Sequence, residues 1–157
     1  MPPRACTYLV ATLSAVALSA PPARAQAVAH QDHKAKPVVQ VYKQSTCGCC
    51  NKWIQHLKVT GFEVKATDVV RLEPIKEEHR VPPVLRTCHT AIVDGYVIEG
   101  HVPADLIQKL LMERPKIAGI GVAGMPAGSP GMESANPVSY EVLSFDKDGR
   151  TAVYAKR

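Results

Sequence analysis

Residues 38–57 read VVQVYKQSTCGCCNKWIQHL, and this stretch decides the fold class. Four of its first five residues are β-branched or aromatic, a composition typical of a buried strand. Apolar residues then recur at helical spacing, at Cys50, Trp53, Ile54 and Leu57. Gly61 follows at the position expected for a helix C-cap. The stretch therefore predicts a strand that turns directly into a helix, with three cysteines at the turn.

The next hundred residues alternate between strand and helix patterns. We expect a strand over 62–65, a short exposed helix over 71–80, a hairpin of 90–93 with 96–99 around Asp94-Gly95, and a helix from Pro103 to Pro115. With its first strands joined by a helical crossover, this order predicts an α/β fold of the thioredoxin-like class, a mixed four-stranded sheet with flanking helices.

Two further segments complete the predicted fold. Residues 116–137 are rich in Gly and Pro and carry Met125 and Met132, so we expect a loop without regular structure. A closing hairpin is expected from 140–145 and 151–154.

The N-terminal residues indicate export. Residues 1–27 have the pattern of a cleaved signal peptide, with Arg4 before an apolar run and small-residue cleavage patterns that end at residue 25 or 27. The apolar run is shorter than the roughly 20 residues of a membrane-spanning helix, and no second run follows. We therefore expect a periplasmic protein with no membrane span in the mature chain, a mobile leader over 28–37 and a single domain over 38–157.

Composition excludes one class of partner and points to another. The formal net charge of +5 comes from scattered residues, and no basic run is interleaved with aromatics, so nucleic acid is not an expected partner. Four of the five cysteines follow the predicted signal: Cys47, Cys49, Cys50 and Cys88. Three of them crowd into four residues, whereas a disulfide framework spreads its cysteines over separate elements. This clustering indicates a reactive or metal-binding site.

The cysteine turn favours the binding of Cu(I). Backbone amides and the positive end of the helix dipole stabilise thiolates at this position. Three thiolates around one turn can bridge several Cu(I) ions, and copper is therefore the expected metal. Zinc is less favoured, because regular tetrahedral sites usually take ligand pairs from two elements.

Further ligands are expected from more distant segments. In a thioredoxin-like topology the segment before the third strand lies against the cysteine turn, which would place Cys88 and His89 there. Met125 and Met132 carry soft thioethers on a flexible loop and could complete a Cu(I) site. His101 could cap the following helix or face the site. His56 and His79 are expected to be solvated.

Two other functions fit the same residues. A thiol-disulfide oxidoreductase would use Cys47 and Cys50, which have the C-x-x-C spacing of a redox dithiol, and would not need Cys49 or Cys88. A passive carrier would instead hand copper to an efflux partner or another periplasmic copper-handling protein without changing its oxidation state.

Several motifs together resemble an exported, CopG-like family of copper-resistance and metal-binding proteins. They are Cys47-Gly48-Cys49-Cys50 with Trp53, Cys88-His89-Thr90-Ala91, the run from Gly95 to Pro103, Arg114-Pro115, and the stretch from Gly124 to Glu133. The resemblance implies a thioredoxin-like, periplasmic protein whose cysteines hold a copper cluster. It also implies interconversion of Cu(I) and Cu(II), which would make the chain a copper oxidoreductase, and leaves the physiological reaction open.

Overall fold

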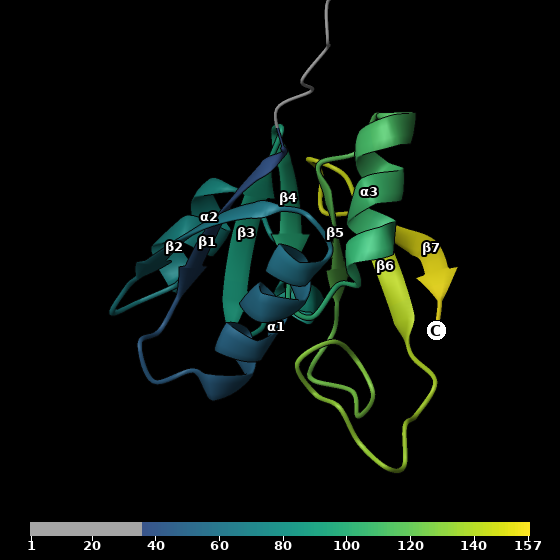
Figure 1. The fold of residues 1–157 in the computed structure, drawn as a ribbon. Coiled ribbons are helices and arrows are strands. Elements are labelled where there is room, and N and C mark those ends of the chain that lie inside the picture. Colours follow the sequence, from purple (N-terminus) through teal and green to yellow (C-terminus); the bar gives the residue numbers. More distant parts are fainter. Residues whose placement is uncertain (1–35) are drawn as a thin grey trace, which may run out of the picture. The chain divides into compact units, whose positions relative to one another are not determined.

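Seven strands form one mixed sheet in the order β2-β1-β3-β4-β5-β6-β7 (Figure 1). The computed structural model describes residues 36–157, which all belong to one compact unit. The predicted signal peptide and nearly all of the predicted leader lie outside the described residues. The elements are β1 (Val38–Lys43), α1 (Gly48–Val59), β2 (Glu63–Asp68), α2 (Glu73–Glu78), the 3₁₀ turn η1 (Pro83–Leu85), β3 (His89–Val93), β4 (Tyr96–Glu99), α3 (Ala104–Glu113), β5 (Gly119–Val122), β6 (Glu141–Phe145) and β7 (Thr151–Lys156).

The strand-to-helix stretch and the hairpin fold as predicted. β1 runs parallel to β2 through the crossover helix α1, and antiparallel to β3. Gly61, just beyond α1, has a φ of +101°, as a C-cap glycine requires. β3 and β4 pair around Asp94 and Gly95, both with positive φ, which is the two-residue turn that matches strand twist.

The expectation of a four-stranded sheet is wrong, because β5 lies inside the 116–137 segment; the rest of that segment, residues 123–137, has no helix or strand, as expected. β5 pairs parallel to β4 and antiparallel to β6, and so joins the C-terminal hairpin to the main sheet. A Cβ at Gly119 would lie 2.1 Å from the carbonyl oxygen of Val97. Glycine is needed where these strands approach closely, and its presence removes the β-branched pattern from which a strand is predicted.

Helices cover both faces of the sheet. α1 and α3 pack on one face, and α2 with the segment after it lies on the other (Figure 1). The first face carries the larger core, in which Trp53, Leu57, Ile107 and Leu110 pack on strand residues such as Val41 and Ile98. The second face has a smaller core of Val81, Leu85, Val97 and Phe145. The ends of β3 and β4 are therefore enclosed from two sides.

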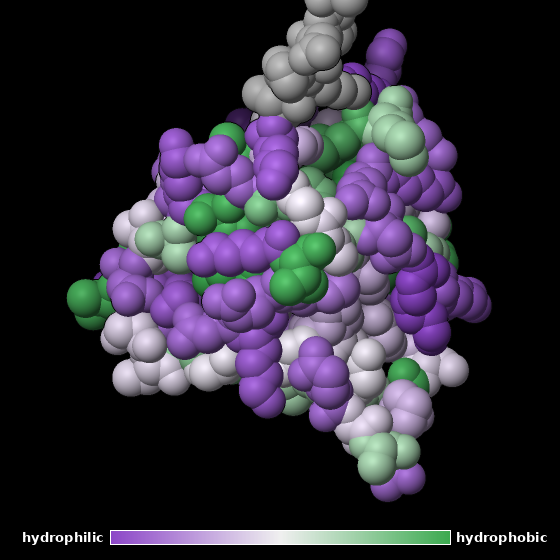
Figure 2. Space-filling view, in the orientation of Figure 1, coloured by the Kyte–Doolittle hydropathy of each residue, from purple (hydrophilic) through white to green (hydrophobic). Residues whose placement is uncertain are grey.

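The surface seen in Figure 2 is mixed in character. Hydrophobic residues appear there as small separate groups among hydrophilic ones. Within residues 36–157, no helix has the length and apolarity needed to cross a membrane.

Candidate metal centre

The first turn of α1 concentrates three cysteines. Cys47 is the N-cap residue, and its side chain makes no capping hydrogen bond. Cys47 and Cys50 form a disulfide, with their Cα atoms 5.4 Å apart, and Cys49 keeps a free thiol. No acidic residue lies in this turn, so the exposed backbone amides favour negative charge on sulfur.

Cys88 lies against this turn, directly before β3. Its Sγ is 3.9 Å from Sγ of Cys49, which in turn is 3.5 Å from Sγ of Cys47. The four sulfur atoms, including that of the buried Cys50, lie within 4.8 Å of one another. We call Cys47, Cys49, Cys50 and Cys88 the thiol cluster. Residues 39 positions apart in sequence are thus brought together by the pairing of β1 with β3.

Two histidines extend the thiol cluster into the core. Nδ1 of His89 and Nε2 of His101 each lie 3.4 Å from Sγ of Cys88. Both rings are fully buried, and that of His89 packs on Trp53 with centroids 4.4 Å apart. The sequence allowed His101 either to cap a helix or to face the site, and in the structure it faces the site.

The tautomer of His101 follows from its second contact. Its Nδ1 lies 2.8 Å from the carbonyl oxygen of Pro130 and donates to it, which leaves Nε2 with a free lone pair toward Cys88. Burial lowers the pKa of His101 below its ordinary value. Burial, with His101 and the Lys76 ammonium nearby, lowers the pKa of His89 to about 3. Both imidazoles are therefore neutral at physiological pH, the form that binds metals.

The same burial holds the proton on Cys88. Desolvation and the adjacent Cys49 raise the pKa of the Cys88 thiol to about 12. At neutral pH this sulfur is thus a thiol, and it releases its proton to solvent when a metal cation binds it directly.

We call residues 124–133, which carry Met125 and Met132, the methionine-rich segment. It lies over the open side of the thiol cluster. The Cys49 thiol donates to Sδ of Met125 at 3.9 Å, while 52% of the Met125 side chain remains exposed. Met132 lines the same hollow of about 520 Å³ beside Cys49. Within the described residues, Met132 makes no sulfur contact with the thiol cluster, so only Met125 is brought to it directly.

Two residues expected to be exposed are instead partnered. His56 accepts a hydrogen bond at Nε2 from the backbone N–H of Ala104 at 3.1 Å, and so caps α3, whereas His79 stays partly exposed at the end of α2. Lys76, in the helix predicted to be exposed, is 3% exposed and pairs with the buried Glu99. Long-range partners decide both cases, and local periodicity does not reveal them.

The His56 cap predicts a pH-dependent contribution to stability. Burial lowers the pKa of His56 from 6.5, against the charges of Glu133 and Asp105. The neutral ring that accepts the hydrogen bond is therefore favoured in the folded state, and the cap stabilises the fold fully above pH 6.5 and is lost as the pH falls through the folded pKa. We expect His56→Ala to cost about 1 kcal/mol at pH 7.5 in urea unfolding, and less on acidification.

The matched control is His79→Ala, which removes a histidine whose ring makes no hydrogen bond within the described residues. A cost for His56→Ala that stays constant from pH 7.5 down to acid would contradict the capping role.

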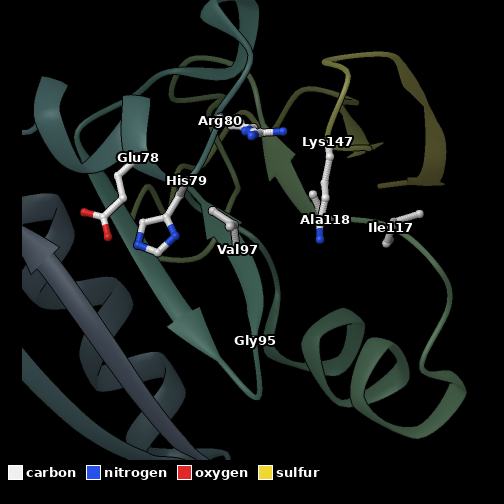
Figure 3. Close-up of a pocket in the computed structure, with 8 residues that line it drawn as sticks. All are labelled: Glu78, His79, Arg80, Gly95, Val97, Ile117, Ala118 and Lys147. Atoms are coloured by element: carbon white, nitrogen blue, oxygen red, sulfur yellow. The ribbon is translucent and has the colours of Figure 1, made fainter.

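A cavity larger than the hollow beside Cys49 lies elsewhere in the described part of the chain. It measures about 580 Å³ and is lined by Glu78, His79, Arg80, Gly95, Val97, Ile117, Ala118 and Lys147 (Figure 3). Gly95 belongs to the β3–β4 turn, whereas Cys88 and His101 lie at the other end of these strands. None of the residues that line this cavity carries sulfur. The donor atoms of the thiol cluster therefore make the cluster, and not this cavity, the candidate functional site.

Sulfur donors at the turn between β1 and α1, with Cys88 and two imidazoles beside them, form a candidate soft-metal site on an α/β sheet. Two solved structures match the chain, titled "Copper resistance protein copG", Form 2 and Form 1. Both are 38% identical, cover 78% of this chain and 99% and 98% of theirs, and have TM-scores of 0.75 and 0.74. The chain therefore belongs to the CopG family of copper-resistance proteins.

A second comparison concerns the site residues themselves. The family described as "Protein of unknown function, DUF411" matches residues 85–132, a segment that holds Cys88, both buried histidines, Met125 and Met132. No curated protein matches the chain significantly.

Proposed function

We propose that this chain is an exported, periplasmic copper-binding protein of copper tolerance, which holds Cu(I) in a cluster bridged by the four thiolates. One observation carries the proposal: four sulfur atoms within 4.8 Å of one another, with two neutral imidazoles against Cys88. The copper-resistance proteins of similar structure support the choice of metal.

The donor set fits copper better than a hard cation. Neither of the two candidate ligand groups contains a carboxylate, and thiolate, imidazole and thioether are the ligands that soft and borderline metals prefer. We propose His89, His101, Met125 and Met132 as outer ligands around the thiolates. Zinc is less favoured, because the crowding of three cysteines into one helical turn opposes a regular tetrahedral site.

We further infer a thioredoxin-like origin for the half of the sheet that carries the site. Its strands run in the order β2-β1-β3-β4, with β1 parallel to β2 and antiparallel to β3. In such a frame, the N-terminal turn of α1 lowers the free energy of thiolates, and the β3 segment supplies the opposing ligand.

Binding by four thiolates requires reduction of the Cys47–Cys50 disulfide. The same pair could supply electrons: oxidation of this dithiol to the disulfide releases two electrons and two protons, enough to reduce two Cu(II) ions to Cu(I). Interconversion of Cu(I) and Cu(II) at the site is thus part of the proposal, and would make the protein a copper oxidoreductase.

The disulfide also favours a second candidate function, thiol-disulfide exchange with protein cysteines through Cys47 and Cys50. That activity would proceed without metal and would tolerate loss of Cys49 or Cys88. Copper binding and metal-free turnover therefore separate the two functions.

Anaerobic Cu(I) titration of the reduced protein against a competing chelator tests the proposal. We expect several copper ions per chain, and we expect Cys49→Ser to bind fewer and to lose about tenfold or more in affinity. Cys49 is the informative position because a dithiol enzyme does not need it. Binding no tighter than that of a simple dithiol, with an indifferent variant, would contradict the cluster and favour the oxidoreductase.

A further inference from the structure

A second buried network lies behind the thiol cluster, on the α2 face of the sheet. Glu99 ends β4 directly opposite Thr90 of β3, and its side chain is fully buried. Its Oε1 accepts from Nζ of Lys76 at 2.5 Å, and from the backbone N–H and Oγ1 of Thr87 at 2.7 and 3.1 Å. Its Oε2 accepts from Oγ1 of Thr90 at 2.7 Å. We call Lys76, Thr87, Thr90 and Glu99 the Glu99 network.

The network is closed and its charges are balanced. Lys76 is buried together with Glu99, and Nζ also donates to Oγ1 of Thr90 at 2.9 Å. A carboxylate taken out of water alone costs several kcal/mol, so the ammonium and the three further donors explain how Glu99 is tolerated there. Gly121 of β5 faces it, and a Cβ at that position would lie 3.1 Å from Cβ of Glu99. The structure therefore reserves space for this one side chain.

The two threonines flank the ligand-bearing segment. Thr87 and Thr90 enclose Cys88 and His89 in sequence, and Glu99 binds both threonines. Cys88 and His89 lie on the α1 side of the sheet, where Cys88 contacts Cys49 and His89 packs on Trp53. A single carboxylate thus holds both ends of the two-residue segment from the face opposite to the site.

We infer that Glu99 is a positioning residue, which through Thr87 and Thr90 fixes Cys88 and His89 against the cysteine turn. The inference rests on the proposed function only in what it says of copper. Loss of the network would let the Cys88 segment move away from Cys49 while α1 and the core on its face stay in place. Leu110, fully buried in α3, belongs to that core, so hydrogen exchange at its backbone amide serves as the reference for global unfolding.

Two variants remove the contacts in different ways. Glu99→Asp keeps the charge, and with it the field on the Cys88 thiol, but is one methylene too short to reach both threonines. Thr90→Val keeps the shape of the side chain and removes the hydroxyl that joins Lys76 to Glu99. Asp94→Asn, at the far end of the same hairpin, is the control, because it removes the exposed ion pair with Arg114 and leaves the network intact.

The test is site-resolved alkylation of the reduced, copper-free protein by iodoacetamide, followed by mass spectrometry. We expect Glu99→Asp and Thr90→Val to speed alkylation of Cys88 by about tenfold while hydrogen exchange at Leu110, measured on the same samples, stays unchanged, and Asp94→Asn to change neither. A parallel rise in Cys88 alkylation and in hydrogen exchange at Leu110 would mean that the network only stabilises the fold, and would overturn the inference. So would unchanged rates in both variants.

A second measurement separates this inference from the proposed function. In the chelator competition, the same two variants should bind Cu(I) about tenfold more weakly than the control. If alkylation changes as expected while the unaltered protein binds no Cu(I), the positioning role stands and the copper function fails. If the unaltered protein binds Cu(I) and the two variants bind it equally tightly, the positioning role fails and the copper function stands.

Discussion

Reduction of the Cys47–Cys50 disulfide is expected to raise the affinity for Cu(I) by more than about a hundredfold. Among residues 36–157, the disulfide form offers only the thiols of Cys49 and Cys88, beside the two buried histidines. Reduction adds two sulfur ligands at the N-terminal turn of α1, where thiolates are favoured. Loss of residues that merely support ligands already costs 10–100-fold in metal affinity, so loss of two ligands should exceed that range.

The measurement is a Cu(I) competition under anaerobic conditions on two samples, one oxidised and one reduced, with the thiol count of each verified by mass spectrometry. A Cys47→Ser, Cys50→Ser double variant is the control, since it cannot form this disulfide and its affinity should not depend on pretreatment with a reductant. Equal affinity of the two wild-type samples would remove Cys47 and Cys50 from the ligand set. The dithiol would then be left to the oxidoreductase alternative.

Sequence patterns predicted those parts of the fold that local rules govern. β1, α1 and the Asp94-Gly95 hairpin follow from periodicity, a C-cap glycine and turn chemistry, all within a few residues. β5 could not be predicted in this way. Its residues Gly119 and Gly121 are required by the closeness of β4, a tertiary contact that has no local signature.

The candidate site likewise has parts that sequence patterns predicted and parts that they did not. Cys88 and His89 could be placed near the cysteine turn because the expected topology brings that segment there, and the structure brings them together. His101 could not be placed, since a histidine before a helix suits a cap as well as a site. Lys76 and Glu99 gave no signal, because a charged residue is expected in solvent unless its partner is known.

Gly131→Ala is expected to destabilise the fold by about 2–4 kcal/mol and to weaken Cu(I) binding by about tenfold. Gly131 has a φ of +88°, and a Cβ there would lie 2.8 Å from the carbonyl oxygen of Cys49 and 2.9 Å from the backbone N of Trp53. Both atoms belong to the backbone of α1 and cannot turn aside. The segment that carries Met125, and the Pro130 carbonyl that orients His101, would be displaced from the thiol cluster.

Gly149→Ala is the control, because it introduces backbone strain without a contact to α1. Gly149, in the turn between β6 and β7, has a φ of +81°, with nothing within 4 Å of a Cβ. Gly149→Ala should therefore lower the free energy of unfolding only by the cost of the left-handed conformation, about 1–2 kcal/mol, and leave copper binding unchanged. Urea unfolding and the chelator competition on both variants make the comparison. If the two variants behave alike in both measurements, contact between the methionine-rich segment and α1 does not hold the site together, and the thiol cluster must be organised by α1 and β3 alone.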